Sequence, residues 1–217
     1  MKYPKIETLY NRDKDTFKVV PGQLRKQEFG LINRWIMTEK VDGMNIRVIL
    51  FPDGHIEFRG RTDKAQLPKE LEKHLTKTFT CDKMYSVFDR DEHGLFPTIV
   101  LYGEGYGPKI QKGGIYRDTQ SFRLFDVRIG DWWQDWDSVM VFAKSLEIQT
   151  VPYVGVLVGG LPDSIESLER IIPTSYVAAQ DGTEGKVQSE GIVARTDPLL
   201  LTRSGQRLMW KLKFRDF

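Results

Sequence analysis

The sequence predicts an α+β fold of mainly antiparallel sheets flanked by helices. Strand patterns occur in pairs joined by turns, helical patterns interrupt them, and the two kinds do not alternate regularly as they do in parallel α/β proteins. The 217 residues, with 40% hydrophobic and 12% aromatic content, suffice for one sizeable core. We therefore expect a single domain over residues 1–217.

The first predicted elements form a β-hairpin within residues 35–61. The alternating, β-rich segments IRVILF and HIEFRGR flank the turn sequence FPDG. A helix follows over residues 67–79, where leucines recur at four-residue intervals and Pro68 suits the first turn. The hairpin and the helix are the first elements of the predicted α+β fold.

The later elements continue this mixture of strands and helices. Strands are expected at residues 98–104, 121–127, 151–158, 190–195 and 207–214, and helices at residues 138–148 and 164–172. No internal repeat or Gly/Pro-rich linker divides them, which favours one compact unit.

The composition excludes several classes of protein. With 32 basic and 30 acidic residues, the net charge of +2 is far from a strong basic excess, so a polyanion site must be a local cluster. The single cysteine, Cys81, excludes an internal disulfide and a multi-cysteine zinc site. Neither a signal peptide nor a membrane span is recognisable. We expect a cytoplasmic protein, with the cytoplasm of a virus-infected host cell as one setting.

The segment TEKVDGMNIR, residues 38–47, contains the first candidate catalytic residue, Lys40. A lysine with a pKa near 10.4 is neutral in only about one molecule in 2,500 at pH 7, so it becomes a nucleophile only through desolvation or nearby cations. An isolated K-x-D-G also occurs by chance on a solvated surface. The motif therefore needs support from the rest of the chain.

Four more motifs follow Lys40 in a fixed order. They are LYGEGYGPKIQKG at 101–113, SFRLFDV at 121–127, SEGIVAR at 189–195 and LMWKLKF at 208–214. Together with TEKVDGMN they resemble the ordered motifs of the covalent nucleotidyltransferase superfamily, and most closely the RNA ligase 2-like (phage-type) ATP-dependent RNA ligases. The resemblance implies an adenylyltransferase domain with an ATP-grasp-like fold. It spans nearly the whole chain.

The resemblance implies that Lys40 attacks the α-phosphorus of ATP and becomes lysyl-AMP. An RNA ligase would then transfer AMP to a 5′-phosphate and join that end to a 3′-hydroxyl. The residues implied to bind ATP or AMP are Glu39, Arg61, Glu104, Phe125, Glu190, Lys211 and Lys213. Arg59 is the alternative to Arg61, because both flank Gly60.

Two of these residues are also implied to bind metal. Glu104 and Glu190 suit Mg²⁺ or Mn²⁺, because Mg²⁺ takes one or two carboxylates beside phosphate oxygens and water. Phe125 matches the aromatic residue that stacks on adenine. Phe122 lies on the opposite strand face and is expected in the core; Phe125 could itself be a core residue.

Lys211 and Lys213 alternate with Trp210, Leu212 and Phe214, so both ammonium groups share one strand face. With Arg61, they would bind the triphosphate and lower the pKa of Lys40 before ATP arrives. Glu39 and Asp42 would oppose that shift, and Asp42 receives no firm role.

The expected partner is RNA with 5′-phosphate and 3′-hydroxyl ends, a nicked duplex being one form. Lys109, Lys112 and Arg117, with Arg59, are the candidates for nucleic-acid contact; a solvated loop is the structural alternative. We expect no C-terminal OB-fold or accessory domain. We expect a monomer with no membrane partner. A minimal ATP-dependent DNA ligase and a nucleotide- or RNA-binding module on the same fold remain as alternative functions.

Overall fold

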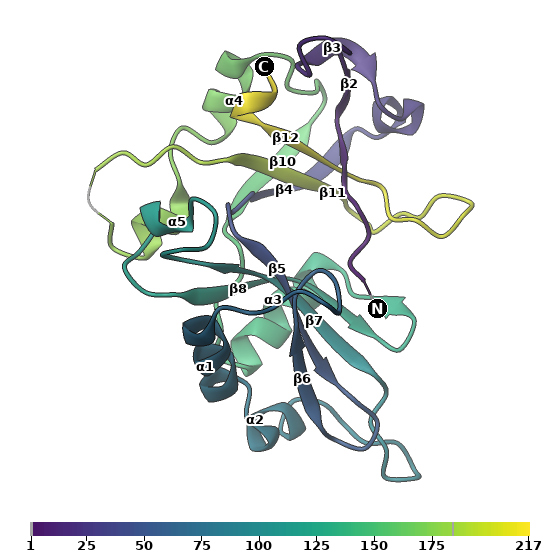
Figure 1. Ribbon diagram of the computed structural model, residues 1–217. Helices are drawn as coiled ribbons and strands as arrows, with labels where there is room; N and C mark the ends of the chain where they lie inside the picture. The colour runs from purple at the N-terminus through teal and green to yellow at the C-terminus, as the bar shows by residue number, and fades with distance from the viewer. Residues whose placement is uncertain (1, 184) are drawn as a thin grey trace. The chain divides into compact units, whose positions relative to one another are not determined.

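A computed structural model describes residues 2–183 and 185–217 (Figure 1). The chain forms two compact units. Unit 1 contains residues Asp42–Val151 and the first residues through Tyr3, and unit 2 contains Pro4–Val41 and Pro152–Phe217. The prediction of a single domain stays a prediction.

Unit 1 is built on an antiparallel five-stranded sheet. Its strands, in spatial order, are β6 (Ile56–Arg59), β5 (Met44–Leu50), β7 (Ile99–Tyr106), β8 (Ser121–Ile129) and β9 (Trp132–Trp133). β5 and β6 are the predicted hairpin, and β7 and β8 match the next two predicted strands. Asn45 of β5 lies opposite Glu104 of β7, and Glu104 lies opposite Arg123 of β8.

Helices pack on one face of this sheet. They are α1 (Lys69–Thr78), α2 (Cys81–Tyr85) and α3 (Trp136–Ser145), and a short 3₁₀ turn, η2 (Gly113–Ile115), lies between β7 and β8. The fully buried Leu71 of α1 packs on Gly105 of β7, where an added Cβ would lie 2.6 Å from Leu71 Cδ2. Phe122 packs edge-on against Phe79, with 5.4 Å between ring centroids. Phe122 is therefore in the core, as predicted.

Unit 2 is built on a second five-stranded sheet. Its strands, in spatial order, are β1 (Glu7–Thr8), β12 (Met209–Lys213), β11 (Gly191–Thr196), β4 (Arg34–Glu39) and β10 (Tyr153–Val158). Among the described residues of this sheet, the β1–β12 pair is parallel and the other pairs are antiparallel. A separate hairpin pairs β2 (Tyr10–Arg12) with β3 (Val19–Leu24). The helical segments are η1 (Gln27–Leu31), α4 (Ile165–Ile171), α5 (Tyr176–Gln180) and η3 (Phe214–Asp216).

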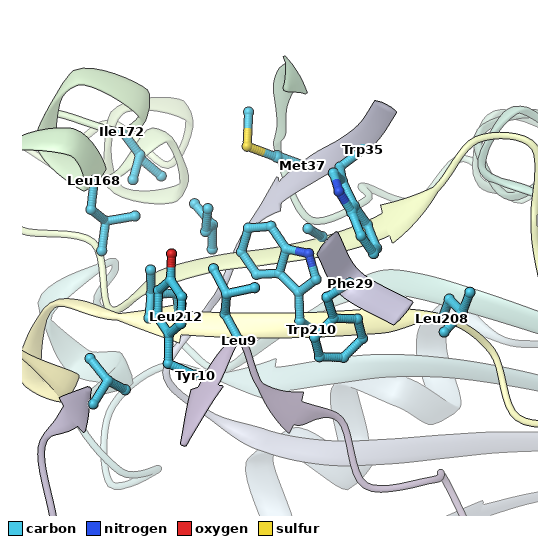
Figure 2. Packing of buried hydrophobic residues seen from close by; sticks show 13 residues of the cluster. Leu9, Tyr10, Phe29, Trp35, Met37, Leu168, Ile172, Leu208, Trp210 and Leu212 are labelled. Carbon is cyan, nitrogen blue, oxygen red and sulfur yellow. The ribbon is translucent and has the colours of Figure 1, made fainter. Parts of the chain in front are cut away.

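The core of unit 2 covers one face of its sheet (Figure 2). Trp35 of β4 and Trp210 of β12 meet at a centroid distance of 5.6 Å and are both fully buried. Leu212 follows Trp210 on this face. Because side chains alternate along a strand, Lys211 and Lys213 point to the other face, as predicted.

The observed fold confirms the α+β class of mainly antiparallel sheets with flanking helices. Each predicted strand and helix is present, although the helix expected from residue 138 begins at Trp136 and ends at Ser145. Among the strands and α-helices of the described residues, the pattern did not predict β1, β2, β3, β9 (Trp132–Trp133), α2 and α5. These elements have two to five residues, except β3, which has six. Within the described ranges, no helix is long and apolar enough to cross a bilayer.

Candidate active site

Lys40 follows directly after the last residue of β4 in unit 2. Its backbone amide donates a hydrogen bond to the carbonyl of Gly191, at 2.9 Å, which extends the β4–β11 pairing by one residue. The Lys40 side chain is 20% exposed. The sheet therefore fixes the backbone of the candidate nucleophile and leaves its amine accessible.

Glu190 lies between two lysines. Its Oε2 is 2.5 Å from Lys40 Nζ, and its Oε1 is 2.5 Å from Lys213 Nζ. The Glu190 side chain is only 9% exposed. Burial alone would raise the pKa of Glu190, but the charges and hydrogen bonds of Lys40 and Lys213 outweigh it and hold this pKa below its usual value. Glu190 is therefore a carboxylate that holds two amines of the site in place.

Lys211 adds a third amine on the same face of the sheet. Burial, followed by the charges of Lys213 and Lys40, lowers the pKa of Lys211 to about 8, while Asp216 acts in the opposite direction. The predicted effect of these cations on Lys40 itself stays a prediction. Lys40, Lys211 and Lys213 together carry more positive charge than the single carboxylate of Glu190 offsets, which suits a phosphate-rich ligand.

The Glu39 carboxylate does not face Lys40, and it is hydrogen-bonded to residues at the start of α5. Its carboxylate is 1% exposed and accepts hydrogen bonds from Ser175 Oγ at 2.6 Å, Tyr176 N at 2.8 Å and Val177 N at 2.9 Å. It therefore joins β4 to the start of α5. Burial raises the pKa of Glu39 in spite of these hydrogen bonds. A role for Glu39 in nucleotide binding stays a prediction, and its carboxylate points to the opposite strand face from Lys40.

In unit 1 the K-x-D-G motif meets the motif that contains Glu104. A Cβ on Gly43 would lie 2.4 Å from the carbonyl oxygen of Gly105 and 2.9 Å from Glu104 Cγ. Gly43 is thus required by a close backbone approach. Asp42, whose role was left open, donates its backbone amide to the hydroxyl of Tyr116 at 3.2 Å.

Asn45 is a residue that the sequence reasoning missed. It lies opposite Glu104 in the β5–β7 pair, and its Oδ1 is buried without a hydrogen-bond partner among the described residues. A buried amide oxygen without a partner is unusual and suggests a ligand that donates to it. Its position five residues after Lys40, within the quoted motif, was the available signal.

Phe125 belongs to an aromatic cluster on the face of the unit 1 sheet opposite Phe122. Its ring centroid is 5.0 Å from that of Tyr3, which also contacts Trp133 at 5.9 Å. The hydroxyl of Tyr3 donates to Asp126 at 2.5 Å. Phe125 is half-buried, so one part of its ring packs in this cluster. Its role in adenine stacking stays a prediction.

Arg59, the last residue of β6, and Arg61, two residues later, have different surroundings. Arg59 is tied to Glu57 and, at 3.5 Å, to Asp63. Arg61 is exposed in the loop that follows. The fully buried Arg47 donates to the carbonyl of Gly60 at 2.9 Å and to Asp63 at 2.7 Å, and so anchors this loop. Arg61 is therefore the more available of the two predicted ligands.

The basic loop between β7 and β8 has a defined backbone. Lys109 and Gln111 have positive φ angles of 66° and 46°, and Gln120 Nε2 donates to the carbonyl of Pro108 at 2.8 Å. Lys109 and Lys112 are exposed and Arg117 is half-buried. The loop displays its cations as expected, and their contact with nucleic acid stays a prediction.

The carboxylates of the described residues do not form a metal cage. No group of three or more His, Cys, Asp or Glu side chains in this part of the chain could hold a metal ion. Glu104 and Glu190 belong to different units. Single carboxylates fit Mg²⁺ or Mn²⁺ held mainly by phosphate oxygens and water. At Glu190 a metal would have to share or replace a lysine partner.

Several solved structures share the fold. A Naegleria gruberi RNA ligase variant with AMP and Mn has a TM-score of 0.62 and 19% identity, covering 97% of this chain and 61% of that one. Another variant of that ligase, with ATP and Mn, has a TM-score of 0.60 and 18% identity, covering 99% and 64%. The chain therefore spans less than two thirds of the length of these proteins. Among curated proteins, none matches the chain.

The sequence motifs and the family comparison lead to the same assignment. The RNA ligase family model matches residues 33–213, a range that includes the first four motifs in full and all of LMWKLKF except Phe214. The lysine, carboxylate and glycine positions described above lie within this range. The chain belongs to the RNA ligase family.

Proposed function

We propose that the protein is an ATP-dependent RNA ligase that joins 5′-phosphate and 3′-hydroxyl ends through a lysyl-AMP intermediate at Lys40. The observation that carries this proposal is the contact of Glu190 with both Lys40 and Lys213, beside Lys211. It supports a site in which the nucleophile and two phosphate-binding cations share one sheet face. The family membership supports RNA as the substrate.

In the proposed first step, the neutral amine of Lys40 attacks the α-phosphorus of ATP. A P–N bond forms and the bond from the α-phosphorus to the pyrophosphate oxygen breaks. The nitrogen, which is positively charged after the attack, then loses one proton to solvent or phosphate. Lys211 and Lys213 would stabilise the charge that develops on the phosphate oxygens. A divalent metal bound near Glu104 or Glu190 would supply further positive charge to these oxygens and orient the pyrophosphate.

The Glu190–Lys40 contact has a consequence for this step. The Lys40 amine is held by a carboxylate oxygen at 2.5 Å, so this contact must open before the amine can attack phosphorus. We infer that Glu190 holds the Lys40 amine in place in the free protein. When the nucleotide binds, its phosphate groups would replace Glu190 as the partner of the lysines. Arg61 would contact the ribose or the 5′-phosphate through its guanidinium fork.

The later steps would use the same cations. The 5′-phosphate of RNA attacks the lysyl-AMP phosphorus, which breaks the P–N bond and returns the amine. The 3′-hydroxyl then attacks the adenylylated 5′-phosphate and AMP leaves. Lys109, Lys112 and Arg117, with Arg59, would contact the RNA backbone outside the site.

Labelling with ATP tests the covalent step. The protein is incubated with α-labelled ATP and Mg²⁺ or Mn²⁺ and resolved by denaturing electrophoresis, with Lys40→Ala and the exposed control Lys73→Ala alongside. We expect acid-labile label on the wild type and on Lys73→Ala only. Equal labelling of Lys40→Ala, or no labelling of the wild type, contradicts the mechanism. Preferential labelling by GTP would point to capping chemistry.

Sealing assays test the substrate. Nicked duplexes that differ only in an RNA or a DNA 3′-hydroxyl strand, and single strands with a 5′-phosphate, are compared at equal enzyme concentration. Preference for an RNA strand supports the proposal, and equal or better sealing of DNA favours a minimal DNA ligase. Labelling without any sealing favours an adenylyltransferase core that requires another segment or partner.

A further inference from the structure

We propose that Arg12 and Asp216 are positioning residues that hold Lys213, and through Glu190 also Lys40, in the geometry of the adenylylation step. We call the contact among Arg12, Asp216 and the backbone of Lys213 the hairpin clasp. The inference rests on the proposed function. Arg12 and Asp216 lie outside every motif that identified the family resemblance, whereas Lys213, Glu190 and Lys40 belong to those motifs.

The clasp centres on a buried carboxylate. Asp216 is 1% exposed, its Oδ1 accepts a hydrogen bond from Arg12 Nη2 at 2.6 Å, and its Oδ2 accepts one from the backbone amide of Lys213 at 3.0 Å. A buried carboxylate is costly unless it is paired and hydrogen-bonded. Here Arg12 supplies the opposite charge, and the hydrogen bond to Asp216 fixes the position of the Lys213 backbone amide.

The β2–β3 hairpin, which carries Arg12, contacts the chain around Asp216 at a second point. Lys18 Nζ donates to the carbonyl of Arg215 at 3.2 Å and to that of Phe217 at 2.5 Å. Arg12 also donates through Nη1 to the carbonyl of Phe17, at 2.6 Å, within the β2–β3 connection. Arg12 is thus oriented on both sides, by its own hairpin and by Asp216.

The clasp leads directly to the candidate nucleophile. The amide of Lys213 contacts Asp216, its Nζ contacts Glu190 Oε1, and Glu190 Oε2 contacts Lys40 Nζ. The backbone amide of Phe214 donates to the carbonyl of Glu190 at 3.1 Å, and Arg215 Nη2 lies 3.6 Å from Glu190 Oε1. With the Lys213 contact, Glu190 is tied to this segment by three contacts. A small displacement of Lys213 would therefore move Glu190 and alter where Lys40 lies.

The clasp contributes to stability as well as to position. Asp216 is buried and Arg12 is 37% exposed, so loss of Arg12 leaves a buried carboxylate without its charge partner and destabilises the folded protein. Misplacement of a reacting group by about 1 Å can in addition lower a rate by about a hundredfold. We expect variants that remain folded to show a lower rate of adenylylation.

The test compares Arg12→Ala, Arg12→Lys and Asp216→Asn in the full chain with the control Arg25→Ala. Arg25 follows the same hairpin, is about half exposed and pairs with Glu7 at 3.5 Å. Single-turnover labelling over a range of ATP concentrations separates the rate from the KM for ATP. Thermal unfolding confirms that each variant is folded at the assay temperature.

We expect Arg12→Ala and Asp216→Asn to lower the maximal labelling rate by about 10- to 100-fold, with a change in KM below about threefold. Arg12→Lys should recover most of the rate, and Arg25→Ala should match the wild type. Wild-type rates in folded Arg12→Ala and Asp216→Asn overturn the proposal. If Arg12→Ala does not fold, Arg12→Gln replaces it, and equal rates for Arg12→Gln and Arg12→Lys overturn the proposal.

Amide hydrogen exchange separates this inference from the proposed function. In Arg12→Ala, or in Arg12→Gln if it is used, the backbone amide of Lys213 should exchange at least about tenfold faster than in the wild type, while core amides of β4 are unchanged. Absence of label on the wild type would refute the lysyl-AMP mechanism. Unchanged exchange at Lys213 would refute the clasp, whether or not the wild type is labelled.

Discussion

The backbone amide of Lys40 donates to the carbonyl of Gly191, and this glycine has a φ of +151°. A Cβ at Gly191 would lie 2.1 Å from the carbonyl oxygen of Leu212 and 2.7 Å from Lys213 Cα. Side chains rarely adopt this backbone conformation, and none fits the space. The glycine after Glu190 therefore allows the strands that carry Lys40, Glu190 and Lys213 to meet.

Gly191→Ala should push β11 away from β12. We expect a loss of about 2 kcal/mol or more in the free energy of unfolding and at least a tenfold decrease in labelling by α-labelled ATP. Urea unfolding and the labelling assay measure the two effects. Gly160→Ala is the matched control, because a Cβ there meets nothing within 4 Å. Equal stability of the two variants would show that β11 tolerates the side chain.

Glu39→Ala should destabilise unit 2 by about 3 kcal/mol, because it leaves three donors at the start of α5 without their acceptor. Glu39→Gln keeps one acceptor oxygen for Tyr176 and Val177 and should cost about 1 kcal/mol. Urea unfolding at neutral pH distinguishes the two. If Glu39→Ala unfolds like the wild type and only loses nucleotide affinity, the structural role is wrong and the predicted ligand role is right.

The raised pKa of Glu39 also predicts the pH dependence of its contribution. The folded state binds the proton more tightly than the unfolded state, so the contribution of Glu39 to stability is largest below its ordinary pKa of 4.5 and falls as pH rises through the raised folded value. Glu39→Gln lacks this titration. The difference in unfolding free energy between wild type and Glu39→Gln should therefore change across that window.

Nucleotide affinity should decrease as pH rises through the pKa of Lys211, about 8 in the free protein. The ammonium form attracts phosphate, and the neutral form predominates above this pH, so the Kd should increase about tenfold between pH 7 and pH 9. Titration calorimetry with an ATP analogue that carries a methylene bridge between the α and β phosphates avoids the covalent step. Lys211→Arg stays charged, and its Kd should change much less. The same slope in Lys211→Arg would assign the titration to another group.

Phe125→Leu separates adenine stacking from core packing. If Phe125 stacks on the base, the loss of its ring should weaken binding of the same analogue by about tenfold, while leucine retains part of the contact with Tyr3. The expected cost in stability is about 1 kcal/mol. Weakened binding with a small loss of stability supports the stacking role. A stability loss of several kcal/mol with unchanged Kd identifies Phe125 as a core residue.

The sequence predicted the parts of the fold that have a regular period. The hairpin of β5 and β6, helix α1 and strand β12 each show an alternation or a leucine spacing that is visible locally. The segments that carry β1 and β2 have two or three residues each, which is too short for a period to emerge. The clasp residue Arg12 lies in such a segment, so no local pattern indicated it.

The residues of the site could be predicted from the sequence, but the contacts among them could not. The motif order identified Lys40, Glu190 and Lys213, but the sequence did not show that Glu190 contacts both lysines. It also gave Glu39 a charge effect on Lys40, whereas the strand turns the Glu39 carboxylate toward Ser175, which is 136 positions away in the sequence. Contacts over such separations arise from the three-dimensional fold.

The alternation of tryptophan, lysine, leucine and lysine along β12 also limits the errors that folding can make. A slip of β12 by one residue would bury Lys211 and Lys213 among Trp35 and Leu9 and expose Trp210. Such a chain would lose its core and fail to fold, so it would not persist as a folded but inactive protein. Every folded molecule in a preparation should therefore have the native register of β12. The hydrophobic core in this way ensures that the lysines lie on the correct face of the sheet.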